Sequence, residues 1–257
     1  MVAKSGNFEA YDLVLRARPL LRQPTRAGLA EARSMLRQAL ALDRDYAEAH
    51  AALGETFHGA LSMGWAESPQ DYWQRVTAHA NDALLVDPRN VRARVLLGRM
   101  HMTYNRYIEA EIEMKRALEV NPNDSDALAG HGNVLLWMGR IKQAIESLEL
   151  AQRIDPALNT YDRFALGLAY YLDGRYAESI EQGELNLRQS PEATFNLAIL
   201  AASYAQNGRK AEAARVADEL RRRDPTFNSL LFGNKFQDTR DLERLRKGFE
   251  KAGIYSR

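Results

Sequence analysis

Residues 116–124 read RALEVNPND, a short apolar helix end followed by a proline between polar residues. Nearly the same phrase returns as DALLVDPRN at 82–90 and as LAQRIDPAL at 150–158. A fixed period of this kind is the signature of a repeat array, in which each repeat contacts only its neighbours. The prolines that mark the repeats are separated by 34, 34, 35 and 34 residues: Pro88, Pro122, Pro156, Pro191 and Pro225.

The composition excludes several classes of protein. Lys plus Arg number 35 against 34 Asp plus Glu, so no overall charge attracts nucleic acid or a membrane surface. The chain has no cysteine, which removes disulfides, thiolate metal sites and cysteine nucleophiles. The first 25 residues hold no uninterrupted apolar core, and no apolar run approaches the roughly 20 residues that span a bilayer. We therefore expect a cytoplasmic protein that binds neither nucleic acid nor a membrane.

Apolar residues between the prolines recur at helical spacing. In residues 91–120, one stripe consists of Val95, Leu96, Met100 and Tyr104, and a second stripe begins at Tyr107. The polar residues 105–106 mark a turn between the two stripes. Each repeat is therefore predicted to be a pair of antiparallel helices, ended by a proline that cannot continue the second helix.

This pattern resembles the tetratricopeptide repeat, whose consensus places Leu-Gly in the first helix, alanine twice in the second and proline at the end. In the third repeat the matching residues are Leu97, Gly98, Ala110, Ala117 and Pro122. The resemblance implies an all-α right-handed superhelix of about six helix pairs. We expect residues 1–228 to form this array without an internal linker, and residues 229–257 to form a C-terminal capping segment.

Two segments depart from the regular repeat. The second repeat carries a ten-residue insertion, and Ser68, Pro69 and Asp71 predict a helix from 69 to about 86 after it. Near the C-terminus, the sequence DLERLRKGFEKAGI places Leu242, Leu245 and Phe249 on one stripe. We expect this helix to cover the last apolar face of the array, so that its deletion lowers stability.

Residues 9–57, the insertion and residues 236–254 resemble the tetratricopeptide regions that follow bacterial class III adenylate or guanylate cyclase domains. This resemblance implies a regulatory or scaffolding segment of a signalling protein. Only eight residues precede the first predicted helix, so no cyclase activity is carried over to this chain.

Catalytic motifs are not found in the sequence. None of the histidines lies in an H-E-x-x-H motif, and no serine lies in a G-x-S-x-G elbow. We therefore predict no enzymatic activity, no cofactor and no metal site. The five histidines are His50, His58, His79, His101 and His131.

In tetratricopeptide proteins the first helices line a concave surface, and the resemblance implies that residues at the same repeat offsets line a groove here. Glu48, His58 and Asp126 also stand at these offsets. A clamp for a C-terminal carboxylate is not expected, because position five of the second repeat is Ala51 and the lysine and asparagine pattern of that clamp is not met. The predicted partner-binding groove consists of Glu55, Arg92, Arg99, Asn133, Trp137, Tyr161, Phe164, Tyr171 and Phe195.

The predicted groove is polar toward the N-terminal half and aromatic toward the C-terminal half. We therefore expect a non-enzymatic scaffold that binds a peptide or protein segment, with acidic groups near Arg92 and Arg99. Three alternatives stay open. Several of the aromatic residues could instead pack inside the array or under the terminal helix, the chain could form a homo-oligomeric scaffold, or it could be the regulatory fragment of a nucleotide cyclase.

Overall fold

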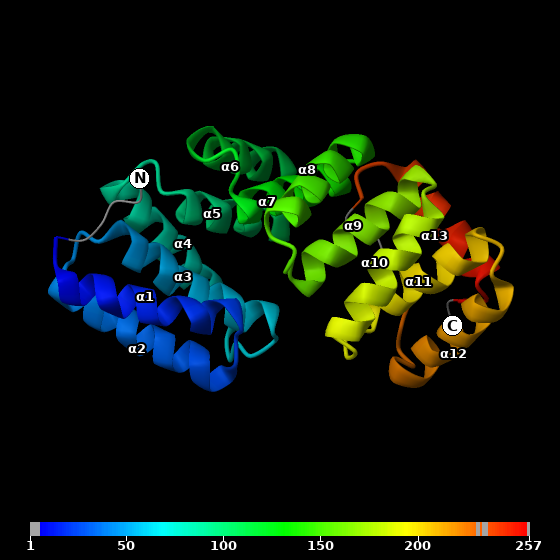
Figure 1. The fold of residues 1–257 in the computed structure, drawn as a ribbon, viewed down its shortest axis with the longest axis horizontal. Helices are drawn as coiled ribbons and strands as arrows, with labels where there is room; N and C mark the ends of the chain where they lie inside the picture. Colours follow the sequence, from blue (N-terminus) through cyan, green and yellow to red (C-terminus); the bar gives the residue numbers. More distant parts are fainter. Residues whose placement is uncertain (1–5, 230–231, 233–235, 256–257) are drawn as a thin grey trace. The chain divides into compact units, whose positions relative to one another are not determined.

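The computed structural model describes residues 6–229, 232 and 236–255 of the chain, and α-helices are the regular elements of these residues (Figure 1). They form two compact units, residues 1–127 and residues 128–257. Each unit is described by itself below. Part of the segment predicted as the cap, residues 230–231, 233–235 and 256–257, lies outside the described residues.

Residues 1–127 form three helix pairs and the beginning of a fourth. Consecutive helices pack as α1 with α2, α3 with α4 and α5 with α6, while α3 also packs against α1 and α5. The order of contacts follows the order of the chain, as expected for repeats that contact their neighbours. The helices are α1 Phe8–Arg22, α2 Arg26–Leu42, α3 Ala47–Ser62, α4 Pro69–Val86, α5 Val91–Thr103, α6 Tyr107–Val120 and α7 Ser125–Trp137, which begins just before the unit ends.

Residues 128–257 continue the pattern and add one helix. Helix α9 packs against α8 and α10, and α11 packs against α10 and α12. The described residues of the whole chain thus hold six helix pairs and a thirteenth helix, which confirms the predicted fold class. The remaining helices are α8 Ile141–Ile154, α9 Thr160–Asp173, α10 Tyr176–Gln189, α11 Phe195–Gln206, α12 Lys210–Arg223 and α13 Thr239–Lys251.

Local sequence signals account for the helix ends. Each repeat proline lies two residues after the last residue of a second helix, where it cannot extend that helix. Side chains of Ser68, Asn90, Asp124 and Asn159 accept backbone N–H groups at the starts of α4, α5, α7 and α9. The helix predicted after the insertion is confirmed with the bounds Pro69–Val86.

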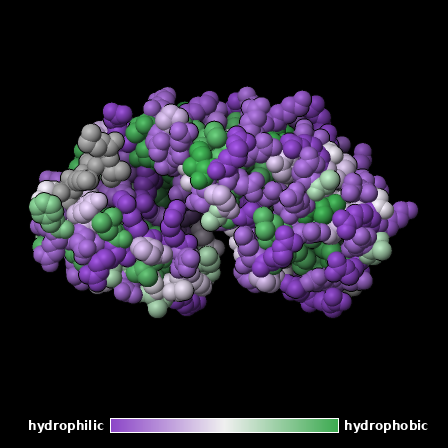
Figure 2. Space-filling model, in the orientation of Figure 1, coloured by the Kyte–Doolittle hydropathy of each residue, from purple (hydrophilic) through white to green (hydrophobic). Residues whose placement is uncertain are grey.

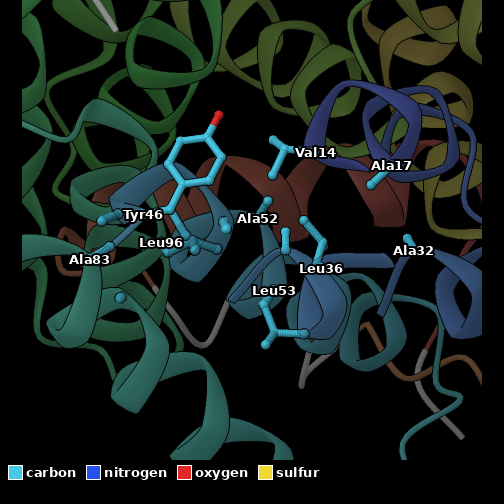
Figure 3. Close-up of a cluster of buried hydrophobic side chains, with 14 of the residues drawn as sticks. Val14, Ala17, Ala32, Leu36, Tyr46, Ala52, Leu53, Ala83 and Leu96 are labelled. Carbon is cyan, nitrogen blue, oxygen red and sulfur yellow. The ribbon is translucent and has the colours of Figure 1, made fainter. Parts of the chain in front are cut away.

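The core cluster of residues 1–127 is built from side chains of α1 to α5 (Figure 3). Val14 of α1, Leu36 of α2 and Ala52 of α3 point into the same buried space. Within the α5 stripe, Val95, Leu96 and Met100 are buried as predicted. Tyr104 is exposed instead, because it is the residue that follows the last helical residue of α5. The apolar stripe therefore predicts burial correctly only for residues within the helix.

Gly132 and Gly98 occupy the same repeat position but have different surroundings. A Cβ on Gly132 would lie 2.6 Å from Leu148 Cγ and 3.1 Å from the Ala144 carbonyl oxygen. A Cβ on Gly98 would lie 2.7 Å from Met114 Cε, the end of a flexible side chain that can move away.

We expect Gly132→Ala to destabilise the protein by up to about 2 kcal/mol. Overpacking costs about 1–3 kcal/mol, and replacing a helical glycine by alanine offsets about 1 kcal/mol of it. Gly98→Ala is the matched control and should be neutral or stabilising. Urea denaturation followed by circular dichroism measures both variants. Equal effects of the two substitutions would contradict this account of helix packing.

Candidate partner-binding faces

The nine residues predicted to line a groove fall into both units. Three lie in residues 1–127, on α3 and α5, and six lie in residues 128–257, on α7, α9 and α11. All nine belong to first helices of the helix pairs, as their repeat offsets predict. We describe the two sets separately, because each belongs to its own unit.

In residues 1–127, the charged face consists of Glu55 on α3, Arg92 and Arg99 on α5, and Asp126 at the start of α7. These side chains line a pocket of about 70 Å³. The pocket walls also include three residues that the groove prediction missed: Val95, Leu96 and Asp124. Val95 and Leu96 stand at repeat offsets that predict packing, and Asp124 caps the start of α7.

Arg92 is the most strongly held group of the charged face. Its guanidinium pairs with the carboxylate of Glu55, and its Nε lies 3.1 Å from Glu48 Oε1. The Glu55 carboxylate is the largest cause that raises the pKa of Arg92 above its usual value. Arg18 Nη2 lies 3.5 Å from the same oxygen of Glu48. Arg92 therefore joins α5 to α3 through two carboxylates.

Arg99 forms a looser pair with Asp126 at 3.0 Å. The Arg99 side chain is 19% exposed, whereas the Asp126 side chain is 66% exposed. The Arg99 guanidinium is the largest cause that lowers the pKa of Asp126, so this carboxylate is ionised at neutral pH. Burial, and then the charge of Arg99, lower the pKa of His58 to about 3, so this imidazole is neutral beside the face. The charged face therefore contains an arginine, Arg99, whose carboxylate partner Asp126 is exposed to solvent.

In residues 128–257, the aromatic face consists of Trp137, Phe164, Tyr171 and Phe195. Trp137, Phe164 and Tyr171 are buried, and Phe195 is half-buried. The ring centroids of Phe164 and Phe195 lie 4.9 Å apart in an edge arrangement. Tyr161 is exposed, and its hydroxyl accepts a hydrogen bond of 3.2 Å from Trp137 Nε1. The structure thus brings together Trp137, Tyr161, Phe164 and Phe195. The ring of Tyr171 contacts Tyr176 instead.

The C-terminal part of the chain packs on the aromatic face. Helix α13 packs against α9 and α11. Phe236 lies 4.7 Å from Trp137 between ring centroids, and Phe232 lies 6.2 Å from Phe164. A Cβ on Gly248 would lie 1.8 Å from the Tyr171 hydroxyl, so only glycine allows this approach. Tyr171 therefore packs under the terminal helix, which was one of the alternatives to a role in the groove.

Asn133 is buried in a polar network beside the aromatic face. Its Nδ2 donates to Asp162 Oδ1 at 2.6 Å, and Asn159 Nδ2 donates to the other oxygen of that carboxylate at 2.5 Å. Asp162 is itself buried, so the two amides compensate a charge that is removed from water. Asn133 thus holds α7 to α9 and is shielded from solvent.

The surface in the view of Figure 2 is mostly hydrophilic in each unit, with smaller hydrophobic areas. No helix among the described residues is both long and apolar enough to cross a membrane.

Comparisons with known proteins give the following matches. The tetratricopeptide repeat model matches residues 91–124 and 125–158. The transcriptional regulator HilA of Salmonella typhimurium is 23% identical over 173 residues, which are 67% of this chain and 31% of HilA. The chain thus spans about a third of the length of this relative.

Solved structures share the fold. The structure of PilF from Pseudomonas aeruginosa has a TM-score of 0.63 and 22% identity, covering 87% of this chain and 96% of that one. The structure of YrrB, a TPR protein with an unusual peptide-binding site, has a TM-score of 0.52 and 19% identity, covering 74% and 93%. The Cut9–Hcn1 complex of the APC/C has a TM-score of 0.63 at 14% identity, covering 93% and 46%.

Tetratricopeptide repeats are generally non-catalytic scaffolds for protein–protein interaction. Their family model matches α5 to α8, and the structural neighbours extend the same helix-pair pattern to the rest of the chain. Residues 91–158 therefore hold two tetratricopeptide repeats, and the chain has the all-α fold of tetratricopeptide repeat proteins.

Proposed function

We propose that the chain is a non-enzymatic scaffold that binds an acidic peptide or protein segment on the charged face of residues 1–127. The observation that carries the proposal is the pocket walled by Arg92, Arg99, Glu55 and Asp126 on the first helices. A partner carboxylate would bind the Arg99 guanidinium in place of Asp126.

The exchange of partners at Arg99 is energetically accessible. The Asp126 side chain is 66% exposed, so its ion pair with Arg99 is of the kind found at protein surfaces. Rotating the Asp126 side chain away from Arg99 into the solvent therefore costs about 0–1 kcal/mol. Arg99 itself is mostly enclosed, and a carboxylate that excludes water from this pocket gains a stronger charge-assisted hydrogen bond. Arginines of this kind are common hot spots of interfaces.

The aromatic face is the second surface on which a partner was expected. Its rings already contact Phe232, Phe236 and α13, so a partner would have to displace the chain's own C-terminal part. We therefore place the partner on the charged face.

The proposal includes a regulatory setting in the bacterial cytoplasm. Its support is the match to a transcriptional regulator over 67% of this chain and the resemblance to tetratricopeptide regions that follow class III cyclase domains. In this setting the chain serves as the interaction segment of a signalling protein.

Self-association is the second candidate function. The observation that favours it is the exposure of Tyr104, Ile108 and Ile112 at and along α6. Ile108 and Ile112 lie on α6, a second helix, and Tyr104 lies in the turn before it, so none of the three stands at a groove position. Light scattering distinguishes the two functions, because a peptide-binding monomer keeps the mass of one chain as its concentration rises.

The test of the proposed function uses a displayed library of random 12-residue peptides, selected on the full chain. We expect the selected peptides to be rich in Asp and Glu. Fluorescence polarisation of one labelled peptide should show about tenfold weaker binding to Arg99→Glu, because hot-spot arginines contribute about 1–3 kcal/mol. The variant should also show a smaller loss of affinity with added salt, because one charge pair is removed.

The charge-matched control is Arg89→Glu, an exposed arginine of the same unit that does not line the pocket. It should bind the peptide as the unchanged chain does. Selected peptides that bind Arg99→Glu with unchanged affinity would show that the charged face is not the binding site.

A further inference from the structure

Three metal-ligating side chains meet between the two helices of the second repeat. His50 lies on α3, while His79 and Asp82 lie three residues apart on α4, on one face of that helix. The Nδ1 atoms of His50 and His79 lie 3.8 and 3.9 Å from Asp82 Oδ2. All three candidate ligand atoms lie within 4.8 Å of one another.

The ring of His50 is oriented for metal binding. Its Nε2 lies 2.9 Å from the Arg44 carbonyl oxygen, and a carbonyl only accepts, so Nε2–H is the donor. In the neutral ring this leaves the Nδ1 lone pair directed at the cluster. Histidines that bind metals generally donate their other ring N–H to a carbonyl or carboxylate, which sets the tautomer.

Both inner ring nitrogens lack a hydrogen-bond partner. The Nδ1 atoms of His50 and His79 are buried, and neither makes a hydrogen bond. The distances to Asp82 exceed the 3.5 Å within which a hydrogen bond forms. Buried polar atoms without partners are uncommon in folded proteins, and a bound ion is one of the explanations for them.

The surrounding residues hold the second ring in place. Phe57 stacks on His79 with 5.8 Å between ring centroids and 12° between planes. A Cβ on Gly54 would lie 3.3 Å from His79 Cβ, so glycine at this position lets α4 approach α3. The Asp82 side chain is 52% exposed, which leaves the outer side of the cluster open to water.

We propose that His50, His79 and Asp82 bind one zinc ion. Two imidazoles and one carboxylate suit zinc, whereas magnesium and calcium prefer oxygen ligands alone. Zinc–ligand bonds of about 2.0–2.1 Å in a tetrahedron place ligand atoms about 3.3 Å apart. The separations from Asp82 Oδ2, 3.8 and 3.9 Å, therefore close with small side-chain rotations. A water molecule completes the coordination on the open side.

Zinc at this place would join the two helices of the second repeat. His50 contributes from α3, and the other two ligands contribute from α4. Because the ligands come together only in the folded chain, zinc should stabilise residues 1–127. The site is separate from the charged face, whose pocket contains none of the three ligands.

Isothermal titration of the full chain with zinc chloride, without an added histidine tag, tests the proposal. We expect one zinc per chain with a dissociation constant on the order of micromolar. His79→Gln and Asp82→Asn should each weaken binding at least about tenfold. Zinc should also raise the melting temperature of the unchanged chain and not that of the variants.

Two further measurements make the outcome decisive. His101→Gln removes another histidine of the same unit and should bind zinc like the unchanged chain. Cobalt(II), used as a spectroscopic substitute, should give visible absorption bands that disappear in Asp82→Asn. Because the Asp82 side chain is exposed, this substitution should leave the fold unchanged. Zinc binding that is undetected in the unchanged chain, or unaffected by His79→Gln and Asp82→Asn, would overturn the proposal.

Discussion

Replacing Phe249 by alanine is expected to destabilise residues 128–257 by about 3–5 kcal/mol, the range for a buried aromatic side chain. Phe249 is almost completely buried in α13, where its ring meets Phe227 and Phe232 at centroid distances of 6.1 and 5.4 Å. Its removal would leave a cavity beside Phe227 and Phe232. Because α13 packs against α9 and α11, we expect both helices to lose protection.

Hydrogen exchange read by mass spectrometry measures this effect helix by helix. It reports on the helices of each compact unit separately. The control is Tyr255→Ala, an aromatic residue just after α13 that is 70% exposed and should change stability by no more than about 0.5 kcal/mol. Unchanged protection of α9 and α11 in Phe249→Ala would show that α13 does not stabilise the aromatic face.

Arg92→Ala is expected to destabilise residues 1–127 by about 2–3 kcal/mol. Removing one partner of a buried ion pair costs about 3–5 kcal/mol, because the other charge remains buried without compensation. The Glu48 side chain is only 8% exposed. The effect should fall below that range, because Arg18 still lies 3.5 Å from Glu48 and Arg92 is partly exposed.

A second substitution separates charge from packing in this experiment. Glu48→Gln in the Arg92→Ala background removes the uncompensated charge and should recover part of the lost stability, as measured by urea denaturation. Arg106→Ala is the control, because its exposed pair with Glu109 at 2.8 Å should contribute about 0–1 kcal/mol. If Glu48→Gln destabilises Arg92→Ala further, the buried charge is not the cause.

The helix on which each predicted groove residue lies could be predicted from the sequence. Repeat offsets correctly placed all nine residues on first helices, because offset in a helical repeat determines the face of the helix. They could not show which side chains stay accessible. Tyr171 and Phe249 are far apart in the sequence, and only the folded chain shows that α13 covers Tyr171.

The candidate zinc site was not predicted from the sequence. His79 and Asp82 have the three-residue spacing of one helix face, but that spacing is common on helices. His50 belongs to the preceding helix and is 29 positions away from His79. The decisive observations are the unpartnered Nδ1 atoms and the hydrogen bond to the Arg44 carbonyl, which exist only in the folded chain.

The sequence alone determined the helix pairs, because their signals are local. Prolines end the second helices, side chains such as Ser68 and Asn90 begin helices, and apolar periodicity selects the buried face of each one. Where α13 packs and which charges pair depend on contacts between segments that are far apart in the sequence. An amphipathic helix requires an apolar surface but does not specify which one, and ion pairs such as Arg92 with Glu48 depend on distances between helices that no local pattern encodes.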